Sequence, residues 1–429
     1  MLIQFSFKNF RSFKDEAILD LTAHKATEFA NQIVQQGGEK ILPVAAIFGA
    51  NASGKSNVHL AFRTMKEFVL RSFNFGGDDE AYQDARPMPF LFSEETESVE
   101  TCFEVHFTIP GDETERVYNY GFCVDGEGVT EEWFNSKAKT ARSYSSIFYR
   151  DKENLELDGL EESSRKNIET ALERQALIAS LGAKLKVEEC KKIRDWFSLN
   201  RAMDFGNPMR NLVASRTLPK GFVNDIKVQE DVVRYLSSFD EGIKGFHIEK
   251  AIREGKEENS TLYRIWSLHE KEGSGAMVEI PLDAESAGTL KMFSLYEPMH
   301  QILQDGGVLF VDELNARLHP LLVRNVIQLF LNPEINKNHA QLVFTIHDTW
   351  HFSNRLLRRD EIWLTEKNAK GESVLYSLAD FEDEDGKRIR KDEDYEKNYL
   401  LGKYGAIPTL KGLYHMVEDN SDGEERQNG

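Results

Sequence analysis

The sequence predicts an α/β fold with a mixed parallel core sheet, an antiparallel β layer and an inserted helical subdomain. An apolar run over residues 41–48 leads through a glycine-containing loop into a helical pattern, which is typical of a strand followed by a helix. Residues 101–109 and 117–124 alternate apolar and polar side chains, as an antiparallel pair does. Between residues 151 and 245, apolar residues recur at three- and four-residue spacings, which indicates helices.

The N-terminal 150 residues are expected to form one lobe. Residues 2–7 alternate as a half-buried strand does, and residues 8–13 (KNFRSF) are expected to turn. A helix is predicted over residues 55–72, after the glycine-containing loop. Residues 73–98 are rich in Gly, Asp, Glu and Pro, so we expect an irregular connection there.

The middle of the chain, residues 151–245, is predicted to be a helical insertion. Helices are expected over residues 163–179 and 187–199. The Gly and Pro residues between 206 and 221 make the insertion too broken for a long heptad coiled coil.

The C-terminal lobe is expected over residues 246–415. Its predicted strands and helices cover residues 262–269, 277–282, 287–303, 308–311, 319–331 and 341–345. The acidic run over residues 380–394 is interleaved with Lys and Arg, so we expect a solvated surface. The polar end, residues 416–429, is predicted to be disordered. The length of 429 residues suits this division, since single cores stop growing near about 250–300 residues.

The composition bears on the partners, the redox state and the location of the protein. A formal net charge of -19 argues against a surface that coats DNA, although it leaves a local basic groove open. The three cysteines, Cys102, Cys123 and Cys190, show no zinc or disulfide pattern, so we expect reduced thiols. The N-terminus lacks a signal sequence, and no stretch approaches the roughly 18–20 apolar residues that span a bilayer. We therefore expect a soluble cytoplasmic protein that is not in the membrane.

Residues 49–56 (GANASGKS) match the pattern G-x-x-x-x-G-K-S, and they lie between the predicted strand and the predicted helix. Backbone N–H groups of such a loop approach phosphates, and the helix N-terminus adds partial positive charge. Lys55 would neutralise the β and γ phosphates of ATP, and the Ser56 hydroxyl would bind Mg²⁺. The alternative is a chance glycine-rich turn. The candidate nucleotide-binding residues here are Gly49, Ala50, Asn51, Ala52, Ser53, Gly54, Lys55, Ser56 and Asn57.

Two adjacent carboxylates follow the apolar run over residues 308–311. We expect Asp312 to be a metal ligand through water, and Glu313 to orient or deprotonate the attacking water. The alternative is an ordinary acidic strand end. His347 follows the next predicted strand, where ligands of open α/β sheets collect, and could contact the γ phosphate. A packed or surface histidine is the other interpretation.

The segment 285–289 (ESAGT) precedes the predicted helix that leads to Asp312. Ser286 can cap this helix, and Gly288 lets a phosphate approach its N-terminus. A plain helix cap is the alternative.

These segments, in this order, resemble ABC-type P-loop ATPases. More narrowly, they are similar to the bacterial AAA15/AAA21 and RloA-like ATPases related to OLD, RecF and Rad50. The likeness covers nearly the whole chain and rests on KNFRSF, GANASGKS, ESAGT, residues 311–320 (VDELNARLHP), residues 344–348 (FTIHD) and residues 396–408 (EKNYLLGKYGAIP). The phosphate loop is shared by all P-loop proteins, whereas the ordered set and the late GKYGAIP block are specific to the narrower group.

The resemblance implies roles by position. Ser286 and Gly288 would bind the γ phosphate of ATP held by a second copy, which gives a homodimer or higher oligomer with shared ATP sites. Residues 315–319 would lie at that interface, and Arg11 would contact the nucleotide or lie on the surface. Two features depart from the general pattern. First, ESAGT stands where the general pattern has Leu-Ser-Gly-Gly-Gln. Second, no glutamine can be assigned to the loop that usually links the nucleotide to the helical lobe, and Gln83 is a poor candidate for it.

Relatives of this kind imply three functions. The first is a sensor or scaffold ATPase of an anti-phage defence system, which controls a separate effector such as an RloB-like TOPRIM nuclease or another toxin. The second is a RecF/Rad50-like DNA-repair clamp, which would need a basic stripe that binds nucleic acid. A transporter ATPase, the third, is disfavoured by the insertions and by ESAGT. This chain itself shows no convincing nuclease centre.

Overall fold

The computed structural model describes residues 1–25, 28–75, 79–207, 209, 217–251, 262–383 and 386–408. The centre of the protein is a six-stranded sheet. The strand that was predicted to precede the phosphate loop is one of its strands. The strands, in sheet order, are β11 (Arg201–Asp204), β15 (Val308–Asp312), β16 (Gln341–Thr345), β5 (Val44–Gly49), β17 (Ile362–Lys367) and β18 (Ser373–Ser377). The first five run parallel and β18 is antiparallel, so the sheet is mixed as predicted.

A seven-stranded antiparallel sheet forms the predicted second layer. Its strands, in sheet order, are β10 (Leu155–Glu156), β9 (Ser145–Arg150), β8 (Val129–Lys137), β7 (Val117–Val124), β6 (Thr101–Phe107), β1 (Leu2–Lys8) and β2 (Ala17–Asp20). Two short strands, β3 (Val34–Gln36) and β4 (Glu39–Ile41), pair beside it. The fold class predicted from the sequence is confirmed.

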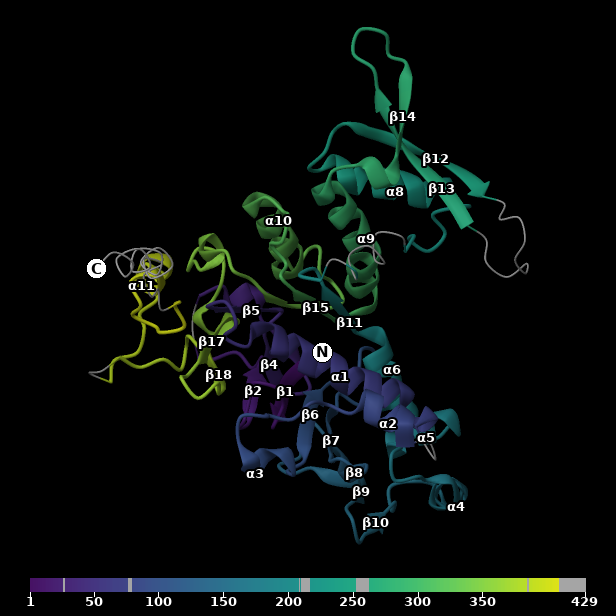
Figure 1. Ribbon diagram of the computed structural model, residues 1–429, viewed down its shortest axis with the longest axis vertical. Helices are drawn as coiled ribbons and strands as arrows, with labels where there is room; N and C mark the ends of the chain where they lie inside the picture. The colour runs from purple at the N-terminus through teal and green to yellow at the C-terminus, as the bar shows by residue number, and fades with distance from the viewer. Residues whose placement is uncertain are drawn as a thin grey trace, which may run out of the picture.

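Helix α1 (Lys55–Arg71) lies between these two sheets (Figure 1). The Phe62 ring lies 5.5 Å from the Phe5 ring of β1 and 5.7 Å from the Phe310 ring of β15. The three aromatic residues are fully buried, so α1 joins the antiparallel layer and one face of the core sheet into one hydrophobic core. Burial of this kind is the main favourable term in folding.

The opposite face of the core sheet packs against α9 (Ala287–Asp305) and α10 (Pro320–Leu331). Alternate residues of β5 serve the two faces: Ala45 and Ile47 face the α1 side, while Val44, Ala46 and Phe48 face the α9 side. Both faces are covered, which is why β5 and β15 have no polar side chain before their carboxyl ends.

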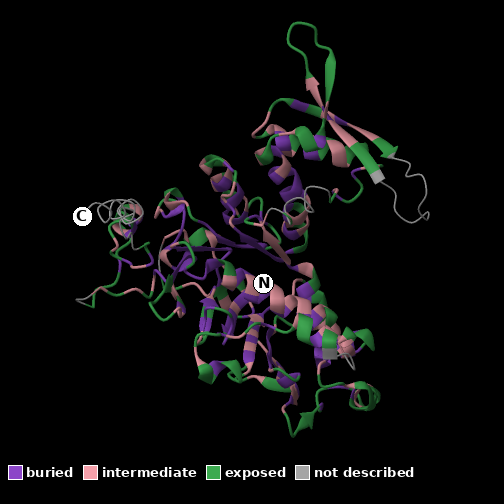
Figure 2. Cartoon of the chain, in the orientation of Figure 1, coloured by how far each residue is buried: buried purple, intermediate pink, exposed green. Residues whose placement is uncertain are grey.

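A smaller three-stranded sheet stands apart from the core at the top of Figure 1. It consists of β12 (Ile243–Ala251), β13 (Leu262–Glu270) and β14 (Met277–Pro281), with α8 (Ile226–Ser237) packed against it. Its β14 strand is mostly exposed, as Figure 2 shows. The remaining helices are α2 (Asp79–Ala85), α3 (Glu94–Glu97), α4 (Glu162–Ala171), α5 (Ile178–Lys184), α6 (Glu188–Leu199), α11 (Tyr395–Leu400) and the 3-10 helices η1 (Ala30–Gln32), η2 (Ser72–Asn74), η3 (Leu282–Ala284), η4 (Thr349–His351) and η5 (Arg359–Glu361). Among the described residues, no helix is long and apolar enough to cross a membrane.

Several predicted element bounds were wrong. The predicted strand over residues 41–48 is broken at Pro43, because proline has no N–H for a sheet ladder, and its two parts join different sheets. The predicted helix over residues 163–179 is two helices, since the Glu132 carboxylate accepts the Ile178 and Ala179 amides and fixes the start of α5 there. The connection over residues 73–98 contains short helices rather than irregular chain alone.

The expectation of reduced thiols was also wrong, because Cys102 and Cys123 form a disulfide. The two residues face each other in the β6–β7 register, with Cα atoms 4.1 Å apart. This close pairing follows from the antiparallel strands that the sequence predicted. Cys190 is a buried free thiol. The predicted tail, residues 416–429, lies outside the described residues.

Candidate functional site

The phosphate loop joins the end of β5 to the start of α1. Gly49 (φ 151°) and Gly54 (φ 117°) adopt backbone conformations that favour glycine. A Cβ at Gly49 would lie 2.4 Å from the Thr365 carbonyl oxygen, and one at Gly54 would lie 2.8 Å from Ser373 Oγ. The loop therefore requires glycine at both positions of the predicted pattern. Ser53 Oγ also hydrogen-bonds to Thr365 Oγ1 at 2.6 Å, which ties the loop to β17.

Lys55 is the first residue of α1 and is buried under the loop. Its Nζ donates to the carbonyls of Gly49 (2.8 Å) and Ala50 (2.9 Å). Burial lowers the pKa of Lys55 to about 8, while Asp312 and Glu313 act in the opposite direction. An ammonium group inside the curve of a loop of main-chain amides is the arrangement that phosphate binding needs.

Asp312 lies at the carboxyl end of β15, two strands away from β5. Its Oδ1 accepts a hydrogen bond of 2.6 Å from Thr345 Oγ1. Burial raises the pKa of the Asp312 carboxyl, while Thr345, the Ser56 hydroxyl and Lys55 act in the opposite direction. The two predicted metal ligands, Ser56 and Asp312, are therefore close enough for the Ser56 hydroxyl to act on the pKa of Asp312.

Glu313 adopts a left-handed conformation (φ 54°), which is uncommon for a residue with a side chain. Its amide donates to Thr345 Oγ1 at 2.8 Å, so Thr345 holds both acidic residues. Glu313 Oε1 lies 3.7 Å from Nε2 of His347, and both side chains are about one-third exposed, at 34% and 37%. Burial and the nearby Lys55 lower the pKa of His347. His347 is therefore not a packed core histidine, since it is exposed and lies beside Glu313.

Three residues of this site were missed from the sequence. Asp204 ends β11 and pairs with Asp312 in the parallel register, and burial together with the Asp312 charge raises its pKa. Gly206 follows, and a Cβ there would lie 2.8 Å from Glu313 Cδ. Thr345 was predicted only as part of a strand. Asp204 and Gly206 could have been predicted only if the four-residue strand β11 had been recognised inside the region that was predicted to be helical.

The N-terminal turn reaches the same edge. Asn57 Nδ2 donates to Ser12 Oγ at 2.7 Å, and Ser373 Oγ donates to the same oxygen at 2.8 Å. Arg11 is exposed and left-handed (φ 51°), and it precedes Ser12 directly. The turn therefore places Arg11 one residue from a contact with the phosphate-loop helix.

Ser286 and Gly288 lie at the start of α9. The Ser286 hydroxyl accepts the Thr289 amide at 3.1 Å, so Ser286 caps α9, as both interpretations of this segment expect. Ser286 is exposed. Among the described residues, no hydrogen bond or ion pair joins this turn to the phosphate loop of the same chain. Gln83 is also remote, since it bonds to the Gly126 carbonyl beside the antiparallel layer.

The residues at this site fit a nucleoside triphosphate together with Mg²⁺. Glycines at residues 49 and 54 let the loop backbone pass close to Thr365 and Ser373, and Lys55 supplies the cation for phosphate oxygens. The hydroxyl of Ser56 and the carboxylate of Asp312 are the hard oxygen ligands that Mg²⁺ prefers.

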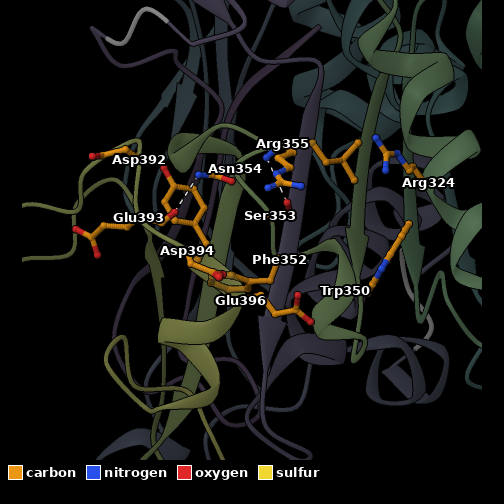
Figure 3. Close-up of a pocket in the computed structure, with 12 residues that line it drawn as sticks. Arg324, Trp350, Phe352, Ser353, Asn354, Arg355, Asp392, Glu393, Asp394 and Glu396 are labelled. Atoms are coloured by element: carbon orange, nitrogen blue, oxygen red, sulfur yellow. Dashed lines mark hydrogen bonds between the residues drawn. The ribbon is translucent and has the colours of Figure 1, made fainter.

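Two cavities lie elsewhere. One, of about 430 Å³, is lined by Arg324 and Trp350 on one side and by Asp392 and Glu393 on the other (Figure 3). Asn354 Nδ2 donates to the Glu393 carbonyl at 2.9 Å and ties its walls together. The other, of about 770 Å³, is more apolar and shares Arg355 and Leu356 with the first. No residue of the phosphate loop lines either cavity.

Comparison with known proteins gives a family match over residues 44–349. The family is described as "AAA domain, putative AbiEii toxin, Type IV TA system". None of the curated proteins compared with the chain matches it.

The matches among solved structures include two structures of SMC heads. The SMC head domain from Thermotoga maritima is 15% identical with a TM-score of 0.41, over 88% of this chain and 98% of that chain. A second, an SMC head bound to the C-winged helix domain of ScpA, is 16% identical with a TM-score of 0.41, over 88% of this chain and 97% of that chain.

Proposed function

The chain belongs to the AAA-domain family that includes the putative AbiEii toxin of a type IV toxin–antitoxin system, and from this premise we propose that it binds and hydrolyses Mg²⁺-ATP. The family match confirms the predicted likeness to AAA21 ATPases. The observation that supports the activity best is the meeting of Lys55, Asp312, Glu313 and His347 at one edge of the core sheet. Hydrolysis needs a phosphate cradle, a metal site and a group that orients water, and these residues can supply all three.

In this proposal each residue has a separate task. The loop amides and Lys55 hold the phosphates. Ser56 and, through water, Asp312 would hold Mg²⁺, which would supply positive charge to the phosphates. Glu313 orients and deprotonates the attacking water, and its carboxylate is accessible for this task. His347, 3.7 Å from Glu313, contacts the γ phosphate. Asp204 lies beside Asp312 and adds negative charge on the metal side of the site.

We also propose that ATP joins two copies of the chain. Ser286 is exposed at the N-terminus of a 19-residue helix and is available to a phosphate held by a second copy. Residues 315–319 follow Glu313 directly and would lie at the same interface, and Arg11 would contact the nucleotide. Such a dimer would contain two shared ATP sites.

The biological role proposed is that of a sensor or scaffold ATPase in anti-phage defence, which controls a separate toxin or nuclease. The family description supports a toxin–antitoxin context. A DNA-repair clamp is disfavoured by the net charge of -19. The cytoplasmic location stays a prediction.

The test is ATP hydrolysis by the purified chain with and without Mg²⁺. Glu313→Gln is expected to slow hydrolysis by at least about 100-fold and to preserve ATP binding, whereas Lys55→Ala should weaken binding itself. Unchanged hydrolysis by Glu313→Gln would remove the catalytic assignment. Purification of Glu313→Gln with its co-expressed genomic neighbours in ATP would then identify the effector. Recovery of no second protein would argue against the scaffold role.

A further inference from the structure

Lys291 is a buried lysine on α9 that has no direct carboxylate partner among the described residues. Its side chain lies on the helix that begins at Ser286, and the residue is only 8% exposed. Its Nζ donates to the carbonyls of Leu314 and Ala316, both at 2.7 Å, and lies 3.4 Å from the Glu313 carbonyl. An ammonium group has three donors, so the three carbonyls can satisfy all of them. The Phe205 ring, 4.1 Å from Nζ, covers the group further.

The three carbonyls belong to one loop, residues 313–317, which carries Glu313. This loop contains two left-handed residues, Glu313 (φ 54°) and Arg317 (φ 60°). Such conformations are strained and persist only where surrounding contacts fix them. Thr345 fixes the loop from β16 through the Glu313 and Leu314 amides, at 2.8 and 3.0 Å.

Lys291 fixes the same loop from the other side. The α9 helix also approaches it at Gly288, where a Cβ would lie 3.3 Å from the Arg317 carbonyl oxygen. The first two turns of α9 and the loop behind Glu313 therefore form one packed unit. A shift of either part must be accommodated by the other, because Lys291 can reach the carbonyls only while both keep their places.

On the basis of the hydrolysis proposed above, we propose that Lys291 is a positioning residue that holds the Glu313 loop in its catalytic conformation and couples it to the N-terminal turn of α9. Its contacts are to main-chain oxygens, so it acts through Glu313 and not on the nucleotide. Loss of the ammonium donors would remove the Lys291 hydrogen bonds to the Leu314 and Ala316 carbonyls, whereas the Glu313 carbonyl would keep the Ala316 amide at 3.0 Å. The loop would then be held less firmly on the α9 side. ATP binding should remain, because Lys55 and the phosphate loop do not contact Lys291 in the described structure.

The first readout is kinetic. Lys291→Met keeps the stem of the side chain and removes its donors, and it should lower kcat by about 10- to 100-fold with KM for ATP within about threefold. Lys291→Arg keeps the charge and should recover part of this loss. The matched control is Lys66→Met, since Lys66 is another lysine on a helix that donates to a carbonyl, that of Asn200, away from the site. Lys66→Met should retain kcat. A Lys291→Met protein with full kcat would overturn the proposal.

The second readout does not depend on hydrolysis. Amide hydrogen exchange over residues 313–317 should be at least tenfold faster in Lys291→Met than in the wild type, and unchanged in Lys66→Met. Unchanged exchange would overturn the role of Lys291 even if the wild type proves to be no ATPase, so the two proposals fail separately. If Lys291→Met does not fold, Lys291→Gln takes its place, because an amide with a shorter stem should also release the loop. Wild-type exchange and kcat in Lys291→Gln would count against the proposal.

Discussion

Gly206→Ala tests whether the position of the Glu313 carboxylate limits hydrolysis. A Cβ at residue 206 would lie 2.8 Å from Glu313 Cδ and 2.9 and 3.0 Å from its two carboxylate oxygens. Non-bonded carbon atoms settle at about 3.5–4.0 Å, so the carboxylate must move by roughly 1 Å. A misplacement of about 1 Å can cost about 100-fold in rate. We therefore expect kcat to fall by about 10- to 100-fold.

The same substitution should leave stability and ATP binding nearly unchanged. The atoms that the added methyl group would displace are the end of a flexible side chain, and Gly206 is not among the residues with positive φ. Replacement of glycine in such a conformation changes the free energy of unfolding by less than about 1 kcal/mol. Lys55 is not affected, so the affinity for ATP should stay within about twofold.

The assay is steady-state ATP hydrolysis together with direct measurement of ATP binding. Gly126→Ala is the matched control, because Gly126 also lacks a positive φ and its added Cβ would meet only Arg86 Nη1, at 3.3 Å. Full activity in Gly206→Ala would refute the assignment of Glu313, and so would a loss confined to ATP affinity.

The other predictions concern dimerisation, pH and the disulfide. Ser286→Arg should spare ATP binding by a single copy but prevent the formation of nucleotide-linked dimers. Light scattering in the presence of ATP would measure the fraction of dimer, and a fraction equal to that of the wild type would rule out the role of Ser286. Burial raises the pKa of the Glu361 carboxyl to about 8. The contribution of this carboxyl to stability is therefore full below about pH 4.5 and is lost as the pH rises through about 8. The Tm of Glu361→Gln should fall less over this pH range than the Tm of the wild type, and an equal fall in both proteins would contradict this prediction. Alkylation of unreduced, denatured protein should label Cys190 and leave Cys102 and Cys123 unlabelled; three labelled thiols would show that the disulfide is absent.

The sequence was sufficient to predict the residues of the phosphate loop and the acidic pair. Their patterns depend on local chemistry: glycine where φ is positive, lysine at the start of a helix, and acids after an apolar strand. The parallel order of β15, β16 and β5 then brings the carboxyl ends of these strands together. Local pattern and sheet order agree at this site, which is why its residues could be found without the structure.

Contacts between segments distant in the chain could not be predicted in this way. Strand β11 has no strand pattern of its own, and it exists because β15 pairs with it and the Asn200 side chain accepts the Val308 amide. Lys291 looks like an ordinary surface lysine in the sequence, since nothing local shows that its ammonium group meets carbonyls of residues 313–316. The start of α5 likewise depends on Glu132, about 46 residues earlier.

We propose above all that the loop over residues 49–56 holds a triphosphate. Titration calorimetry with Mg²⁺ and a slowly hydrolysed ATP analogue tests it most directly, with Lys55→Ala as the comparison. We predict a measurable heat of binding and one nucleotide retained per wild-type chain, with affinity reduced at least about tenfold in Lys55→Ala. Folded wild-type protein that gives no heat and retains no nucleotide would show that this loop does not hold a triphosphate.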